Sequence, residues 1–148
     1  MKSVAAALTS AVVVVLLAGC GTSPIPAPTF GFGDDAVTIA RAVKACRAAA
    51  SQPVPADATG ISSIATCSIT GSQVDFFVWT DAAAQAAQSP ANASTDSGTS
   101  EAYVAHGDGW DALTHDPGRA SAQKIIAGSI VSSVGGTVVH VGNSGLSG

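Results

Sequence analysis

One stretch of the sequence decides the fold: Cys67-Ser68-Ile69-Thr70-Gly71-Ser72-Gln73-Val74-Asp75-Phe76-Phe77-Val78-Trp79. Its centre, residues 70–73, is typical of a two-residue hairpin turn, because Gly71 at the first central position suits a type II′ turn. The predicted register places apolar residues on one side of the sheet, where Ile69 faces Val74, Cys67 faces Phe76 and Ala65 faces Val78.

The opposite side of this hairpin carries Ile64, Thr66, Asp75, Phe77 and Trp79. Two aromatic side chains are unusual on a sheet face that contacts water. Either a second layer of structure covers them, or they form an exposed binding patch. Phe77 and Trp79 on this face, together with Trp110 at the tip of the second predicted hairpin, are the candidate binding surface of the chain.

A helix is predicted from about Asp35 to Ala50, before the hairpin. Asp34 and Asp35 suit the start of a helix, where negative charge is favourable. One face of the helix is apolar, with Ala36, Ile39, Ala40, Val43, Cys46 and Ala50 at helical spacing. The basic residues on one flank, Arg41, Lys44 and Arg47, indicate either a solvated edge or a docking site for an acidic partner.

Capping and turn signals predict the remaining elements. Asp81 can cap a short helix to about Gln88, and residues 89–100 form a polar loop. Asp108-Gly109 favours a second hairpin, 101–106 against 110–115. Asp116-Pro117 begins a helix that stops at Gly135 or Gly136. Its inward side chains are Ile125, Ile126, Ile130, Val131 and Val134. A strand over 137–141 and a flexible tail over 143–148 follow.

This order, α-β-β-α-β-β-α-β, predicts the α+β class. We expect an antiparallel sheet of about four to five strands with helices packed on it. The sheet and its helices would form a single domain over residues 34–142.

The first twenty residues have the layout of a secretory signal peptide. Lys2 supplies a positive charge, Val4 to Leu17 are apolar, and the segment ends in Leu17-Ala18-Gly19-Cys20. The apolar run is about fourteen residues, and a membrane-spanning helix needs about twenty. The last four residues resemble the lipobox of bacterial lipoproteins; the alternative is an ordinary signal peptide that ends this way by chance. The resemblance implies removal of residues 1–19 and a diacylglycerol thioether on Cys20.

Residues 20–33 are rich in Pro and Gly and would form a tether between the lipid and the domain. The sequence has three cysteines, an odd number that leaves one without a disulfide partner in an exported protein. If Cys20 carries lipid, Cys46 and Cys67 remain as one pair in an oxidising compartment, which predicts a disulfide. The alternative, two reactive or metal-binding thiols, lacks a close-spaced pair or a nearby histidine.

Removal of Lys2 with the signal peptide leaves five Lys and Arg against ten Asp and Glu, a formal net charge of −5. That balance argues against nucleic acid or anionic lipid as a general partner. The acyl chains on Cys20 would be the attachment to the membrane, and an envelope protein is the other expected partner.

Residues of catalytic type gather in the second predicted hairpin, where His106, Asp108, Asp111, His115 and Asp116 lie close in sequence. The Asp-Gly turn places His106 opposite Asp111. This pair is an ordinary cross-strand contact, a general base with its orienting carboxylate, or half of a metal site. No further ligand lies at metal-binding spacing, and nucleophile-elbow, phosphate-loop and dinucleotide motifs do not occur in the sequence. We expect no metal, no cofactor and no catalytic activity.

Beyond the lipobox, residues 67–79 and Gly107-Asp108-Gly109-Trp110 resemble small lipoproteins of actinobacteria and their prophages. The similarity covers roughly residues 40–115. The resemblance implies the location and the size of the protein more than its function. Our first hypothesis is a lipid-anchored, non-catalytic binding or accessory protein on the outer face of the cytoplasmic membrane. Alternatives are a prophage-encoded protein that excludes superinfecting phage, or a hydrolase that uses His106, Asp111 and His115.

Overall fold

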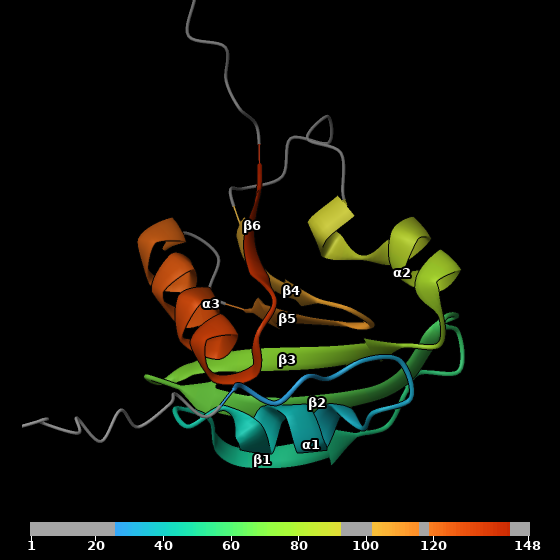
Figure 1. Ribbon diagram of the computed structural model, residues 1–148, viewed down its shortest axis with the longest axis horizontal. Coiled ribbons are helices and arrows are strands. Elements are labelled where there is room, and N and C mark those ends of the chain that lie inside the picture. Colours follow the sequence, from blue (N-terminus) through green and yellow to red (C-terminus); the bar gives the residue numbers. More distant parts are fainter. Residues whose placement is uncertain (1–25, 93–101, 116–118, 143–148) are drawn as a thin grey trace, which may run out of the picture.

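The computed structural model describes residues 26–92, 102–115 and 119–142. The predicted signal peptide, Cys20, the helix start at Asp116-Pro117 and the tail over 143–148 lie outside these residues. The described chain contains three α-helices, six strands and a short 3₁₀ helix (Figure 1). In chain order these are α1 (Ala36–Ala42), β1 (Arg47–Gln52), β2 (Ile61–Ile69), β3 (Ser72–Trp79), α2 (Ala82–Gln88), η1 (Pro90–Asn92), β4 (Ala102–Gly107), β5 (Trp110–Thr114), α3 (Ala120–Val134) and β6 (Thr137–Val141).

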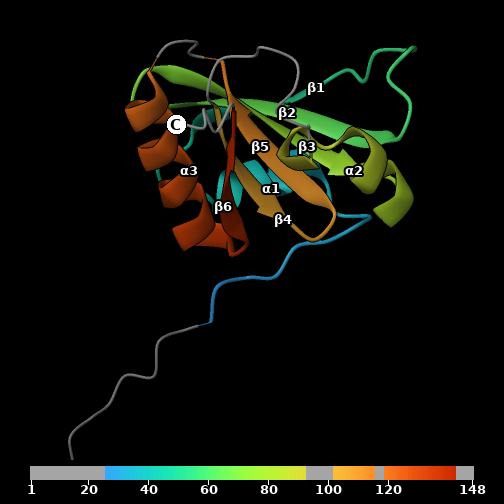
Figure 2. The same ribbon diagram turned by 90° about the horizontal axis from the view of Figure 1, so that it is seen from above.

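The strands form one antiparallel sheet in the order β1-β2-β3-β5-β4-β6. α1 and α3 pack on one face, here called the inner face, and share a single cluster of buried side chains with it. α2 contacts β3, and η1 contacts β4 and β6, on the opposite, outer face. In Figure 2, α2 and α3 stand at opposite sides of the molecule. The α+β class is confirmed, but the sheet has six strands instead of four to five.

The hairpin of β2 and β3 turns one residue earlier than predicted. Thr70 and Gly71 are its central residues, and both have positive φ, 51° and 89°. Ile69 therefore faces Ser72, and Cys67 faces Val74, so the predicted pairs were wrong by two residues. A shift of two residues leaves each side chain on the same face, because side chains alternate with period two. The predicted apolar face is confirmed.

α1 ends at Ala42, and the prediction of a helix to Ala50 was wrong. Asp35 caps its start, since the carboxylate accepts a hydrogen bond from the backbone N–H of Val37 over 2.9 Å. The alanine-rich residues that follow form β1, which pairs with β2 through a bulge beside Ala48. Tertiary strand pairing here outweighs the helix propensity of alanine. β1 is the strand missing from the predicted order.

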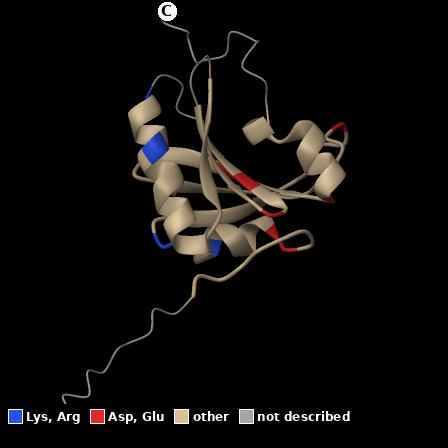
Figure 3. Cartoon of the chain, turned by 45° about the horizontal axis from the view of Figure 1, so that its top comes forward, with Lys and Arg blue, Asp and Glu red and all other residues tan. Residues whose placement is uncertain are grey.

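This early helix end also relocates the basic residues that the sequence placed on one flank of a helix. Arg41 lies in the last turn of α1, Lys44 in the connection after it, and Arg47 begins β1. All three are exposed. Figure 3 shows Lys and Arg along α3 and around the end of α1, while Asp and Glu lie toward the side of α2 and at the start of α1, which Asp35 caps. The charges are thus partly segregated on the domain.

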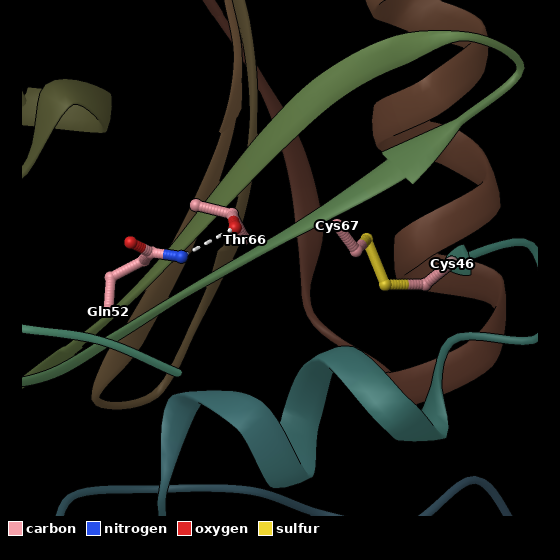
Figure 4. Close-up of a disulfide and its surroundings, with 4 residues drawn as sticks. All are labelled: Cys46, Gln52, Thr66 and Cys67. Atoms are coloured by element: carbon pink, nitrogen blue, oxygen red, sulfur yellow. Dashed lines mark hydrogen bonds between the residues drawn. A yellow bond between two sulfur atoms is a disulfide. The ribbon is translucent and has the colours of Figure 1, made fainter. Parts of the chain in front are cut away.

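The disulfide predicted between Cys46 and Cys67 is confirmed, with the two Cα atoms 5.6 Å apart (Figure 4). Cys67 lies on the inner face of β2 and is buried, whereas Cys46 lies in the connection between α1 and β1 instead of on a helix. Thr66, the residue before Cys67, accepts a hydrogen bond through its hydroxyl from the Gln52 side chain over 3.1 Å. The disulfide therefore fastens the α1–β1 connection to β2, close to the turn that leads into β3.

α3 supplies the other half of the inner core. Ile126, Ile130 and Val134 are buried, and Gly135, with φ of 82°, ends the helix as predicted. Ile125 is 71% exposed, so its predicted inward position was wrong. Successive helical residues point about 100° apart, so Ile125 and Ile126 do not share the narrow buried face.

The packed domain starts before residue 34, where the sequence placed its beginning. Phe30 packs against the inner core. The N–H of Gly31 donates a hydrogen bond to the Asp34 carboxylate over 2.8 Å. A Cβ at Gly109 would lie 2.4 Å from the backbone nitrogen of Phe32, so this segment presses on the β4–β5 turn. The end of the predicted tether is thus part of the fold.

Candidate binding face

The three aromatic residues predicted as binding-surface residues occupy three different environments. Trp110 is 2% exposed and belongs to the inner core. A Cβ at Gly107 would lie 2.1 Å from the Trp110 ring, so the indole lies directly on that glycine. Trp110 therefore cannot form part of an exposed binding surface, and that prediction was wrong.

Trp79 lies on the outer face but is only 3% exposed. Its Nε1 donates a hydrogen bond to Oδ2 of Asp111 over 2.7 Å. This part of the outer face carries α2 and η1, which contact β3 and β4. Of the two alternatives for the outer aromatics, a covering second layer holds for Trp79. Its predicted place in an exposed patch was wrong.

Asp111 is completely buried and accepts hydrogen bonds through both carboxylate oxygens. Oδ1 lies 2.6 Å from Nδ1 of His106, which is directly opposite in the register, as predicted. The His106 side chain is 29% exposed. A buried carboxylate is costly unless it is hydrogen-bonded, and the indole and imidazole provide those bonds. The Trp79–Asp111–His106 arrangement joins β3, β5 and β4 on the outer face.

A buried glutamine on α2 was missed by the sequence analysis. Nε2 of Gln85 donates to the carbonyl of Gly107 over 2.8 Å, and Oε1 accepts from the N–H of Gly109 over 3.0 Å. Gln85 thus fastens α2 to the β4–β5 turn through two hydrogen bonds. The only signal was a polar residue in the middle of an alanine-rich helix, which also fits a solvent-exposed position.

His115 does not join His106. Its Nε2 pairs with Oδ2 of Asp75 instead. The two histidines thus each bind a different carboxylate on the outer face. Among residues 26–92, 102–115 and 119–142, there is no group of three His, Cys, Asp or Glu side chains that could hold a metal ion. His106, Asp111 and His115 therefore do not form the single site that the hydrolase alternative requires.

The rest of the outer face is not fully buried and forms the open face of the sheet. We define it by the residues Ile64, Thr66, Asp75, Phe77, Leu113 and His115, which are half-buried or exposed. The register places Phe77 opposite Ile64 on one side, and Asp75 opposite Leu113 on the other.

Hydrogen bonds between side chains order this open face. Gln73 donates to the Asp75 carboxylate over 3.1 Å, and Gln52 donates to the Thr66 hydroxyl. The face therefore combines an aromatic ring, branched apolar side chains and a fixed carboxylate. Such a mixture of apolar area with a few oriented polar groups suits molecular recognition. Phe77 is the one predicted surface aromatic that lies on it.

No family model, no curated protein and no solved structure matches this chain. No helix among the described residues is long and apolar enough to cross a membrane.

Proposed function

We propose that this chain is a lipid-anchored protein of the bacterial cell envelope that acts by binding a partner and not by catalysis. The observation that carries the proposal is the Cys46–Cys67 disulfide, which uses two of the three cysteines. Cys20 is then the one cysteine left over, and it ends the segment that resembles a lipobox.

The compartment follows from the same disulfide. Disulfides persist in oxidising environments and are rare in the bacterial cytosol. An N-terminal segment with a positive charge and a short apolar run directs export. Both features agree with a domain that stands on the outer face of the cytoplasmic membrane, held by acyl chains on Cys20.

Binding is assigned to the open face. The hydrolase alternative needs His106, Asp111 and His115 in one site, and His115 pairs with Asp75 instead. The open face presents Phe77 two residues from Asp75 on β3, and His115, directly after β5, pairs with that Asp75. We take it as the contact surface for an envelope protein.

Fractionation of the cell tests the anchor. We expect the wild-type chain to partition into the detergent phase and to incorporate labelled palmitate, and Cys20→Ser to lose both properties. Cys46→Ser with Cys67→Ser is the matched control, which removes the other two cysteines and keeps the lipobox. Unchanged detergent partitioning of Cys20→Ser would refute the lipid anchor.

Photo-crosslinking tests the binding face. A photoreactive amino acid in place of Phe77 should give a discrete adduct in intact cells, while the same group in place of Ile125 should not. Ile125 is a matched control, because it is apolar and exposed but lies on α3, away from the open face. Equal crosslinking at both positions, or none at Phe77, would contradict the assignment.

A further inference from the structure

The position at which the chain enters the domain determines which end of the fold lies nearest the lipid. The described chain begins at Pro26, six residues after Cys20. Six residues reach at most about 20 Å even when fully extended. If Cys20 is acylated, as proposed above, the surface around Pro26 therefore stays within that distance of the bilayer.

The chain enters beside one particular group of residues. Ala27, Lys44, Ser132 and Ser133 line a hollow of about 390 Å³ between the incoming segment, the α1–β1 connection and the last turns of α3. Lys44 is exposed there, and no ion pair is observed for it among the described residues. The entry point of the tether thus coincides with a free positive charge.

Two more exposed cations flank Lys44 in the chain: Arg41 in the last turn of α1, and Arg47 at the start of β1. We call the surface of Arg41, Lys44 and Arg47 the basic end. They are three of the five Lys and Arg that remain after residues 1–19. No Asp or Glu occurs between Ala36 and Ala56 in the sequence. The acidic residues of the described chain lie toward the side of α2 and at the start of α1 (Figure 3).

We infer that the basic end docks on anionic phospholipid headgroups and orients the domain on the membrane. The net negative charge argues against anionic lipid as a partner for the whole surface, but it permits a local contact, because charges beyond about 8–10 Å are largely screened at physiological salt. An acyl chain combined with a basic surface gives a more stable attachment than the acyl chain alone. In this orientation the side of α2, with its acidic residues, points away from the bilayer.

Amine labelling of the acylated protein in vesicles tests the inference. The mature chain has two lysines, Lys44 at the basic end and Lys124 on α3, which is exposed and serves as the internal control. Each basic residue near an anionic surface contributes enough attraction for about a fivefold change in occupancy. We therefore expect Lys44 to react about fivefold more slowly in phosphatidylglycerol vesicles than in phosphatidylcholine vesicles, with little change at Lys124.

The double variant Arg41→Gln with Arg47→Gln should remove most of this difference, because both side chains are exposed and their loss does not disturb the core. Equal rates for Lys44 in the two lipids would overturn the inference, as would equal protection of both lysines. If soluble polyphosphate slows the labelling of Lys44 in the absence of vesicles, the inference would also be overturned, because the basic end would then bind a soluble polyanion. Failure of the wild-type protein to bind either vesicle would refute the lipid anchor itself, so the two proposals fail separately.

Discussion

The indole Nε1 of Trp79 donates a hydrogen bond to Oδ2 of Asp111 over 2.7 Å, and both side chains are buried. This bond joins β3 to β5 on the outer face, while Oδ1 of the same carboxylate bonds to His106 on β4. Trp79, which the sequence analysis assigned to a binding surface, therefore links β3 and β5, the two central strands of the sheet.

Trp79→Phe should destabilise the domain by about 1–3 kcal/mol, because it leaves one buried carboxylate oxygen without its donor. The free energy of unfolding is measured by urea titration. In a double-mutant cycle with Asp111→Ala, residues in direct contact show a coupling of about 0.5–3 kcal/mol. Additive effects of the two substitutions would contradict the bond.

Gln85→Leu should lower the free energy of unfolding by about 2 kcal/mol, because the buried N–H of Gly109 and carbonyl of Gly107 lose their partner. Gln88→Leu, at an exposed position on the same helix, should stay within about 0.5 kcal/mol of wild type. Similar losses in the two variants would show that α2 does not dock through Gln85.

Gly107→Ala should cost about 1–3 kcal/mol or more, because the new methyl group would overlap the Trp110 ring. Gly128→Ala in the middle of α3 is the control, since its Cβ would meet nothing within 4 Å. Alanine should stabilise that helical position by up to about 1 kcal/mol. Thermal unfolding of the two variants should therefore shift in opposite directions.

Replacing both Cys46 and Cys67 by alanine should lower the free energy of unfolding by about 3 kcal/mol. The cause is the loop that the bridge closes, with a sequence separation of 21 residues. In the unfolded, unreduced mature protein we expect no titratable thiol, because the proposal assigns the third cysteine to the lipid. A free thiol would contradict either the bridge or the acylation, and its position in a peptide map decides which.

The hairpins of the fold could be predicted because their signals are local. Gly71 and Asp108-Gly109 each indicated a turn, and the alternation of side chains then fixed which residues face the core. The exact register of the first hairpin could not be predicted. Thr70 adopts a positive φ, which is uncommon for a β-branched residue.

The features that the sequence analysis did not predict depend on contacts between residues far apart in the chain. Alanine at positions 48–50 favours a helix, and only pairing with β2 makes these residues a strand. Alternation placed Trp79 on the outer face correctly but contained no information about α2 covering it. The cluster around Asp111 was predicted as a His106–Asp111 pair, and the indole that completes it comes from another hairpin.

Mass spectrometry of the N-terminal peptide of the mature protein tests the central claim most directly. The lipid-anchor proposal predicts that this peptide begins at Cys20 and carries the mass of a diacylglycerol group on that residue. An unmodified N-terminus at Cys20, or a chain that still contains residues 1–19, would contradict it.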